Sequence, residues 1–214
     1  MRVRSAGVVP DQATDVSAEW SVATRCRPGE LTNGDLGVVE LCHDGVLLAG
    51  IDGVGHGADA ARAARRAGDI VRSESGEDLA ALAMLCHAAL RDTRGAALTL
   101  ARLSTAKGEV TWLGIGNVEG RVISGEAPAA GPKGSLALAA GVPGHELPRI
   151  RPETLTVRPG DVLILATDGI RATFADALDV SGSTAAIAAR IMRTDYRRVD
   201  DAVVVAARYL GRRA

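Results

Sequence analysis

The segment Asp52-Gly53-Val54-Gly55-His56-Gly57 joins two stretches of opposite character. The apolar run 46–51 before it has the length and composition of a buried β-strand, and the alanine-rich run 58–67 after it favours an α-helix. Glycines at such a junction allow the backbone to approach a metal ion or a phosphate closely, and the helix N-terminus adds amide donors. The segment lacks the Gly-Lys-Ser/Thr of a Walker A motif and does not match Gly-x-Gly-x-x-Gly, so no nucleotide-binding fold is predicted.

Blocks of strands and blocks of helices follow one another on both sides of this segment. Strand-like runs at 20–26, 37–42 and 46–51 precede two predicted helices at 58–67 and 78–90. Further strands are predicted at 97–103, 109–113, 120–123, 162–166 and 202–207, with a helix at 183–193. The Gly- and Pro-rich residues 124–152 predict an irregular loop around a short strand at 136–139. Segregated blocks of this kind predict an α+β fold, an antiparallel β-sandwich flanked by α-helices, in a single domain covering residues 1–214.

Composition excludes several classes of function. The 25 basic residues nearly balance the 26 acidic ones, which leaves no long-range field for nucleic acid or an anionic membrane. Aromatic residues make up only 2% of the chain, too few for base-stacking platforms. No apolar run approaches the roughly 18 residues of a membrane helix, and the N-terminus lacks the apolar stretch of a signal peptide. We therefore expect a cytoplasmic protein, with Cys26, Cys42 and Cys86 as reduced thiols, that binds neither nucleic acid nor membrane.

Four aspartates recur in one local context, at the end of an apolar strand or in a glycine turn. They are Asp35 after Gly34, Asp52 before Gly53, Asp168 before Gly169, and Asp200 before Asp201 and Ala202. Carboxylates at strand ends are rigidly placed, and Mg²⁺ and Mn²⁺ prefer oxygen ligands of this kind. An isolated Asp-Gly pair is most often an ordinary turn, but four such contexts together favour a metal site.

On these residues the sequence resembles the metal-dependent protein phosphatases, the PPM family, and its bacterial SpoIIE-like branch, which dephosphorylates regulators of sigma-factor pathways. The resemblance spans nearly the whole chain. Asp52-Gly53 stands where the branch more often has Asp-Val, a variant similar to the short, stand-alone RsbX-like members. The matching segments, in order, are Gly34-Asp35, D-G-V-G-H-G at 52–57, G-I-G-N at 114–117, A-T-D-G-I at 166–170 and D-D-A-V-V-V at 200–205.

The resemblance implies a PPM phosphatase-like sandwich with two Mn²⁺ or Mg²⁺ ions between its sheets. Asp52 would bridge the two ions, Asp35 and the carbonyl of Gly53 would serve the first, and Asp168 and Asp200 the second. Asp52 and Asp168 are the expected catalytic residues. Residue chemistry does not separate Asp200 from Asp201, but neighbouring side chains on a strand point to opposite sides, and the family pattern favours Asp200.

The leading hypothesis is hydrolysis of phosphoserine or phosphothreonine on a partner regulatory protein of the sigma-factor or stress-signalling type, by a metal-bridging hydroxide. The alternatives are a catalytically weak pseudophosphatase acting as a binding module, and a small-molecule phosphatase.

His56 could protonate a leaving group, although a structural role at the helix start is favoured. Asn117 is interpreted as a turn residue. The basic edge formed by Arg62, Arg65 and Arg66 could attract a phosphoprotein or be a solvated helix face. Oligomeric state is left open.

Overall fold

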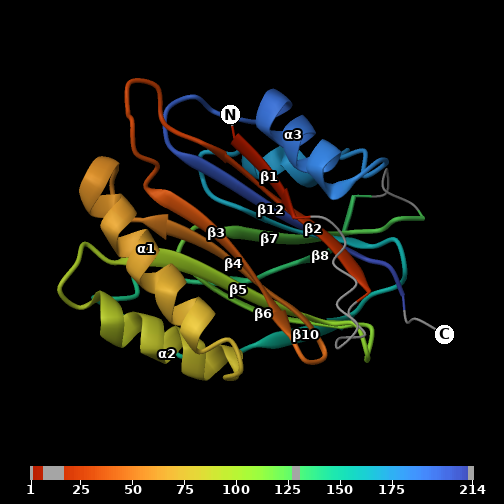
Figure 1. Ribbon diagram of the computed structural model, residues 1–214, viewed down its shortest axis with the longest axis horizontal. Helices are drawn as coiled ribbons and strands as arrows, with labels where there is room; N and C mark the ends of the chain where they lie inside the picture. Colours follow the sequence, from red (N-terminus) through yellow and green to blue (C-terminus); the bar gives the residue numbers. More distant parts are fainter. Residues whose placement is uncertain (1, 7–16, 127–130, 212–214) are drawn as a thin grey trace.

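Two β-sheets pack face to face, and helices cover the outer face of each sheet (Figure 1). The computed structural model describes residues 2–6, 17–126 and 131–211. The first sheet runs in the spatial order β1 (Arg2–Ala6), β2 (Ala18–Arg25), β12 (Ala202–Tyr209), β11 (Val162–Ala166), β7 (Glu119–Ile123) and β8 (Pro132–Ser135). The second sheet runs in the order β10 (Glu153–Thr156), β6 (Glu109–Ile115), β5 (Ala96–Ser104), β4 (Gly45–Gly53) and β3 (Asp35–Cys42), with β9 (Leu138–Ala139) paired to β6. Among the described strands every pairing is antiparallel except that of β6 with β9.

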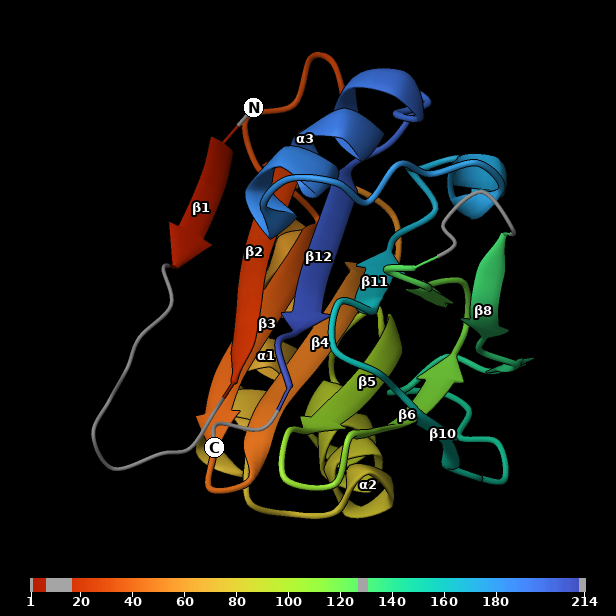
Figure 2. The same cartoon turned by 90° about the vertical axis from the view of Figure 1, so that its right-hand side faces the viewer.

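In the described part of the chain, three α-helices and one short 3₁₀ helix form the outer layers. Helices α1 (Gly57–Ser73) and α2 (Leu79–Leu90) cover the second sheet, and α3 (Thr184–Thr194) lies across the first (Figure 2). The 3₁₀ helix η2 (Ala172–Ala175) follows β11 in the chain. The Asp78 carboxylate accepts a hydrogen bond from the Ala81 amide at 2.8 Å, and the Ser183 hydroxyl accepts one from the Ala186 amide at 3.2 Å. These side chains fix where α2 and α3 begin, because each satisfies an amide that has no partner within its helix.

Apolar side chains fill the three spaces between these four layers. Trp112, Leu48 and Leu165 belong to the cluster between the two sheets, Leu82 and Leu100 to the cluster beneath α1 and α2, and a third cluster lies beneath α3. The sheets approach closely at Gly37, where an added Cβ would lie 2.7 Å from Val22 Cγ1. With so few aromatic residues, close packing of Ala, Val, Leu and Ile supplies most of the apolar burial.

The predicted α+β sandwich is confirmed, and most predicted elements differ from the structure by only a few residues at their ends. The strand predicted at 136–139 is confirmed only for its last two residues, which form β9, because Leu136 instead packs between the sheets. Strands β1, β8 and β10 and the helix η2 were not predicted. The assignment of one domain to residues 1–214 stays a prediction. Among the described residues, no helix is long and apolar enough to cross a membrane.

Candidate active site

The carboxylates lie at one end of the sandwich, where several strands start or stop. Asp35 at the start of β3 is opposite Asp52 at the end of β4. Ala166 at the end of β11 is opposite Glu119 at the start of β7, and Ala202 at the start of β12 is opposite Arg25 at the end of β2. We call this the site end of the sandwich. Its short connections, which we call the site-end connections, are residues 26–34, 54–56, 91–95, 116–118, 167–171 and 195–201, and the longer segment 140–152 also reaches this end at Gly141 and Val142.

A cavity of about 300 Å³ opens at the site end. Three of the predicted site residues, Asp52, Asp168 and Asp200, line it together with His56 and Asn117. Small or apolar residues complete its wall; they are Val54, Gly55, Ala97, Gly116, Gly141 and Val142. Aspartates from both sheets therefore face one cavity.

The Asn117 amide connects two of these carboxylates. Its Nδ2 donates to Asp52 Oδ2 at 3.0 Å and to Asp168 Oδ2 at 2.8 Å. Asn117 lies between β6 of one sheet and β7 of the other, so it reaches an aspartate of each sheet. The two N–H groups place partial positive charge between two carboxylates, which is where a cation would be favoured. Sequence reasoning interpreted Asn117 as a turn residue, and no local sequence signal reveals this contact across the sheets.

Asp35 lies next to Asp52 but is almost completely buried. Its exposed fraction is 8%, and it does not line the cavity. Its Oδ2 atom has no hydrogen-bond partner among the residues that the structure describes. Burial, followed by the nearby charge of Asp52, raises the pKa of Asp35 well above its usual value, although a hydrogen bond from Thr167 opposes the rise. A buried carboxylate oxygen without a donor is unfavourable, and a cation would satisfy it.

The same causes raise the pKa of the aspartates in the cavity. Burial, and then the charge of Asp168, raises the pKa of Asp52 to about 7. Burial, and then Asp200, raises the pKa of Asp168, whereas Asn117 and the Arg197 guanidinium lower it. Each carboxylate is desolvated and faces another carboxylate, so the site favours neutralisation by protons or by metal ions.

The structure separates Asp200 from Asp201. Both carboxylate oxygens of Asp201 accept backbone hydrogen bonds at 2.8 Å, one from the Arg27 amide and the other from the Gly34 amide. Asp201 is 1% exposed and holds the 26–34 connection against the start of β12. Asp200 lines the cavity, and one of its oxygens accepts a bond from the Asp201 amide at 2.9 Å. The neighbouring side chains thus point to opposite sides, and Asp200 is the one that faces Asp52 and Asp168.

Glycine at position 53 is required by close packing against α1. An added Cβ would lie 2.1 Å from the Ala60 carbonyl oxygen, and the Gly53 amide donates to the Gly34 carbonyl at 3.2 Å. Gly55 and Gly57 have φ angles of 92° and 76°, in the left-handed region that glycine adopts at little cost. The segment therefore turns sharply from β4 into α1 and keeps Asp52 at the cavity. The role of the Gly53 carbonyl as a ligand stays a prediction.

His56 has a partner that sequence reasoning did not identify. Its Nδ1 lies 2.8 Å from Glu30 Oε1, and both side chains are partly exposed. His56 lines the cavity at the residue before α1 and makes no capping hydrogen bond there. The two residues are 26 positions apart and meet only because the 26–34 connection folds over the start of α1.

The residues at the site suit a hard divalent cation, although they do not form a closed cage as they stand. Within residues 17–126 and 131–211, no three Asp, Glu, His or Cys side chains are close enough together to make a formed metal site. The donor atoms are carboxylate oxygens, one of them buried without a partner, and the pKa values of three aspartates are raised. Oxygen donors of this kind fit Mg²⁺ or Mn²⁺ better than softer metals.

Solved structures share this architecture. A chain described with the words "The bacterial stressosome: a modular system that has been adapted to control secondary messenger signaling" is 30% identical, with 89% of this chain and 99% of that chain covered and a TM-score of 0.82. RsbX, solved in complex with magnesium, is 19% identical over 89% of this chain and 94% of its own, with a TM-score of 0.77. The serine/threonine phosphatase PstP/Ppp of Mycobacterium tuberculosis is 20% identical over 90% of this chain and 99% of its own, with a TM-score of 0.63. None of the curated protein sequences compared with the chain matches it.

The fold is that of the PP2C-type protein phosphatases. Within this class, the family model described as Stage II sporulation protein E (SpoIIE) matches residues 43–210. The chain belongs to the SpoIIE family of serine/threonine protein phosphatases.

Proposed function

We propose that this protein removes phosphate from phosphoserine or phosphothreonine on a regulatory partner protein, using two Mn²⁺ or Mg²⁺ ions at the site end. The observation that carries the proposal is the meeting of Asp52, Asp168 and Asp200 in one cavity, with the Asn117 amide between two of them. RsbX, which shares the fold, was solved with magnesium. The cytoplasmic location expected from the sequence belongs to the same proposal.

Each aspartate would have a distinct task. Asp52 would contact both cations, since it lies between Asp35 on the adjoining strand and Asp168 on the other sheet. Asp35 would contribute its unpartnered oxygen as a ligand of the first ion, and Asp168 and Asp200 would be ligands of the second. Two bound divalent cations supply an activated water and neutralise the phosphate charge. Asn117 would keep the side chains of Asp52 and Asp168 oriented toward each other.

His56 is positioned to transfer a proton at the edge of the cavity. The Glu30 carboxylate beside its Nδ1 fixes the ring and favours a proton on that nitrogen, which leaves Nε2 as the atom free to exchange a proton with a leaving group. This assignment goes beyond the structural role that the sequence favoured, because His56 makes no helix-capping bond and lines the cavity.

A protein substrate is favoured over a small metabolite by the surface around the cavity. Three exposed apolar side chains belong to the connections there: Leu31 (99% exposed), Val54 (41%) and Val199 (58%). Val54 lines the cavity, and Val199 precedes Asp200. Apolar side chains at the edge of an open polar site suit contact with a second protein, whereas a metabolite site would enclose most of its ligand.

Turnover with and without metal tests the proposal. Purified protein in EDTA and in Mn²⁺ is incubated with phosphoserine peptides and with p-nitrophenyl phosphate, and calorimetry measures Mn²⁺ binding separately. We expect metal-dependent release of phosphate from both substrates. Binding of Mn²⁺ without turnover of either substrate would favour the pseudophosphatase, and turnover of p-nitrophenyl phosphate alone would favour a small-molecule phosphatase.

A further inference from the structure

Arginines are concentrated around the mouth of the active site. The site-end connections and residues 57–67 of α1 carry nine arginines, which we call the arginine rim. They are Arg27, Arg62, Arg65, Arg66, Arg91, Arg94, Arg171, Arg197 and Arg198. Outside the predicted metal-site aspartates and Asp201, the same stretches carry four carboxylates, those of Glu30, Asp59, Asp92 and Asp195. The nine arginines still outnumber the carboxylates when Asp168, Asp200 and Asp201 are counted, which gives seven, although the chain as a whole has a net charge of −1.

The opposite end of the sandwich has the reverse balance. The connections there are residues 43–44, 74–78, 105–108, 124–126, 157–161 and 179–183. They carry two basic side chains, Lys107 and Arg158. Their seven acidic side chains are Asp44, Glu74, Glu77, Asp78, Glu126, Asp161 and Asp179. A chain that is nearly neutral overall is therefore polarised along its strands, with its positive end around the active site.

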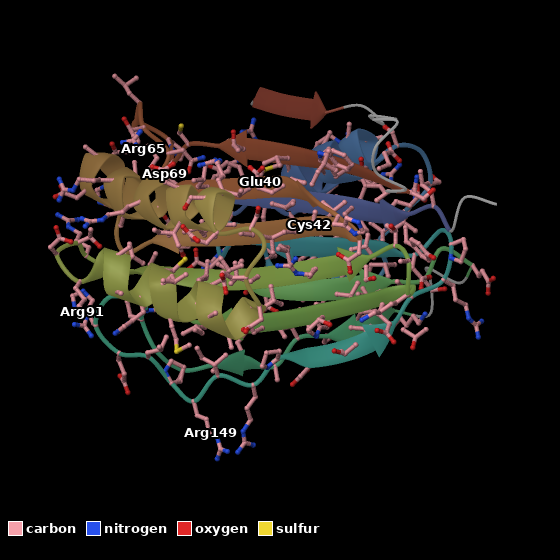
Figure 3. All side chains as sticks on the ribbon, turned by 60° about the horizontal axis from the view of Figure 1, so that its bottom comes forward. Glu40, Cys42, Arg65, Asp69, Arg91 and Arg149 are labelled. Atoms are coloured by element: carbon pink, nitrogen blue, oxygen red, sulfur yellow. The ribbon has the colours of Figure 1, made fainter. Side chains whose placement is uncertain are left out.

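Part of the rim is neutralised within the protein, and part is not. Asp59 pairs with both Arg62 and Arg94, each at 3.0 Å. In the part of the chain that the structure describes, the exposed side chains of Arg65 and Arg91 form no ion pair or hydrogen bond. Arg91 projects from the end of α2, and Arg65 projects from the middle of α1 (Figure 3). Arginines without internal partners keep their charge and donors available to a second molecule.

Arg94 joins this part of the rim to the cavity. Its Nη1 would lie 3.0 Å from a Cβ added to Gly55, and Gly55 lines the cavity. The α1–α2 side of the rim is therefore continuous with the active site. A segment of a partner whose phosphoserine enters the cavity would pass over these arginines.

A second, independent observation comes from the other side of the cavity, at Arg198. Among the described residues, Arg198 is the one non-glycine residue with a positive φ angle, 62°. Residues other than glycine adopt this conformation at a cost, and such strain is concentrated at functional sites. The exposed Arg198 side chain forms no ion pair or hydrogen bond in the described structure and follows Arg197, whose guanidinium donates to the Asp168 carbonyl at 3.2 Å.

We propose that the arginine rim is the docking surface for the phosphoprotein substrate, and that this substrate carries acidic residues on both sides of its phosphoserine. This inference rests on the proposed function and adds the chemistry of the partner. Complementary charges accelerate association and reject partners of the wrong charge, while the metal site performs the same chemistry on any phosphate ester that reaches it. The rim thus selects the substrate.

A purely internal role for these arginines explains less of the structure. If they only offset the carboxylates of the cavity, they would lie against those carboxylates. Arg65 and Arg91 instead lie on exposed helix and turn surface, and Arg62 and Arg66 pair with Asp59 and Asp92, outside the cavity.

Matched phosphopeptides test the rim. The probes are two peptides of equal length, one with a phosphoserine between glutamates and the other with a phosphoserine between lysines, assayed with Mn²⁺ at low and high salt. The quantity measured is the ratio of their kcat/KM values. For the wild-type protein we expect about a tenfold or greater preference for the acidic peptide at low salt, which decreases as salt screens exposed charges.

Charge reversal then locates the preference. Arg65→Glu combined with Arg91→Glu should bring the ratio of kcat/KM values close to one. The matched control at the opposite end is Lys107→Glu combined with Arg158→Glu. It should leave the ratio within about twofold of the wild-type ratio, because those charges lie well beyond a Debye length of about 10 Å from the active site. Arg198→Gly should lower the ratio while leaving the melting temperature equal or higher, because glycine adopts φ 62° without strain.

The outcomes separate the two proposals. Equal rates on the two peptides, or a preference that the control variant abolishes as strongly as the rim variant, would overturn the docking surface and leave the phosphatase intact. A fall in melting temperature with an unchanged ratio in Arg198→Gly would remove Arg198 from the rim. If neither peptide is hydrolysed while p-nitrophenyl phosphate is, the proposed protein substrate itself is wrong.

Discussion

Replacing Asp52 with asparagine should affect stability and activity in opposite directions. In the metal-free protein, burial and the charge of Asp168 raise the pKa of Asp52 from its usual value of 3.8 to about 7. The folded state therefore binds this proton more tightly than the unfolded chain does. Ionised Asp52 destabilises the fold, and this cost is absent below about pH 4, grows up to about pH 7 and is complete above it.

The size of the effect follows from the shift. At 1.36 kcal/mol per pKa unit, ionised Asp52 costs at most about 4 kcal/mol above pH 7. Asparagine removes the charge and keeps the shape, so Asp52→Asn recovers part of this free energy. For a chain of this length about 1 kcal/mol moves the melting temperature by roughly 2–4 °C, so half of the gain already corresponds to about 4–8 °C.

Two assays are needed, because only the combination identifies a metal ligand. Thermal unfolding in EDTA at pH 4.5 and pH 8 should show Asp52→Asn to be more stable than the wild type at pH 8, with a smaller difference at pH 4.5. Turnover of a phosphopeptide in saturating Mn²⁺ should fall by about 100-fold or more, since even residues that only support a metal ligand cost about 10–100-fold.

The exposed Asp176, the residue after η2, provides the control, because Asp176→Asn should move the melting temperature by no more than about 2 °C, as usual for surface substitutions. A metal-free Asp52→Asn protein that melts at or below the wild-type temperature at pH 8 would refute the electrostatic reasoning. Near-wild-type turnover in Mn²⁺ would refute the role of Asp52 in metal binding.

Three further predictions concern the neighbouring residues. Mn²⁺ at about 100 times its dissociation constant should stabilise the protein by about 2.7 kcal/mol through preferential binding to the folded state, and identical melting curves in EDTA and Mn²⁺ would argue against a metal site. Asp201→Asn should lower the free energy of unfolding by roughly 2–4 kcal/mol, because both carboxylate oxygens accept hydrogen bonds from backbone amides. Asp200→Asn should chiefly weaken Mn²⁺ binding in calorimetry. The reverse pattern would exchange the roles of the two residues. Asn117→Ala should lower the metal-free melting temperature, since Asp52 and Asp168 lose their shared donor, and an increase would show that this bridge does not stabilise the fold.

Most of the fold could be predicted because its central elements carry strong local signals. The apolar run Val162–Ala166 has the predicted boundaries, and Asp78 and Ser183 mark the beginnings of α2 and α3 as capping residues. Strand β10 was missed because its residues are mostly exposed and show no apolar alternation. It is a strand only because it pairs along its length with β6. The sequence pattern does not encode that neighbour.

The site was predictable to a different degree. Asp52, Asp168 and Asp200 could be found because each ends or begins a strand beside a glycine or a second aspartate, and the structure brings all three to one cavity. The contacts of Asn117 and Glu30 could not be found. They depend on how two sheets and a long connection meet in space, and the residues involved are 26 to 65 positions apart.

The free energy by which the clustered aspartates destabilise the metal-free fold helps to distinguish an enzyme from an inactive binding module. Three neighbouring aspartates have raised pKa values, and one oxygen of Asp35 is buried without a donor. In a protein that never bound cations, asparagine at Asp35 or Asp52 would relieve like-charge repulsion and desolvation without creating a void. The carboxylates are nevertheless all present, next to an asparagine whose amide already occupies the space between two of them. Such an arrangement destabilises the empty fold and is stabilised by divalent cations. We therefore favour a working phosphatase over a docking module.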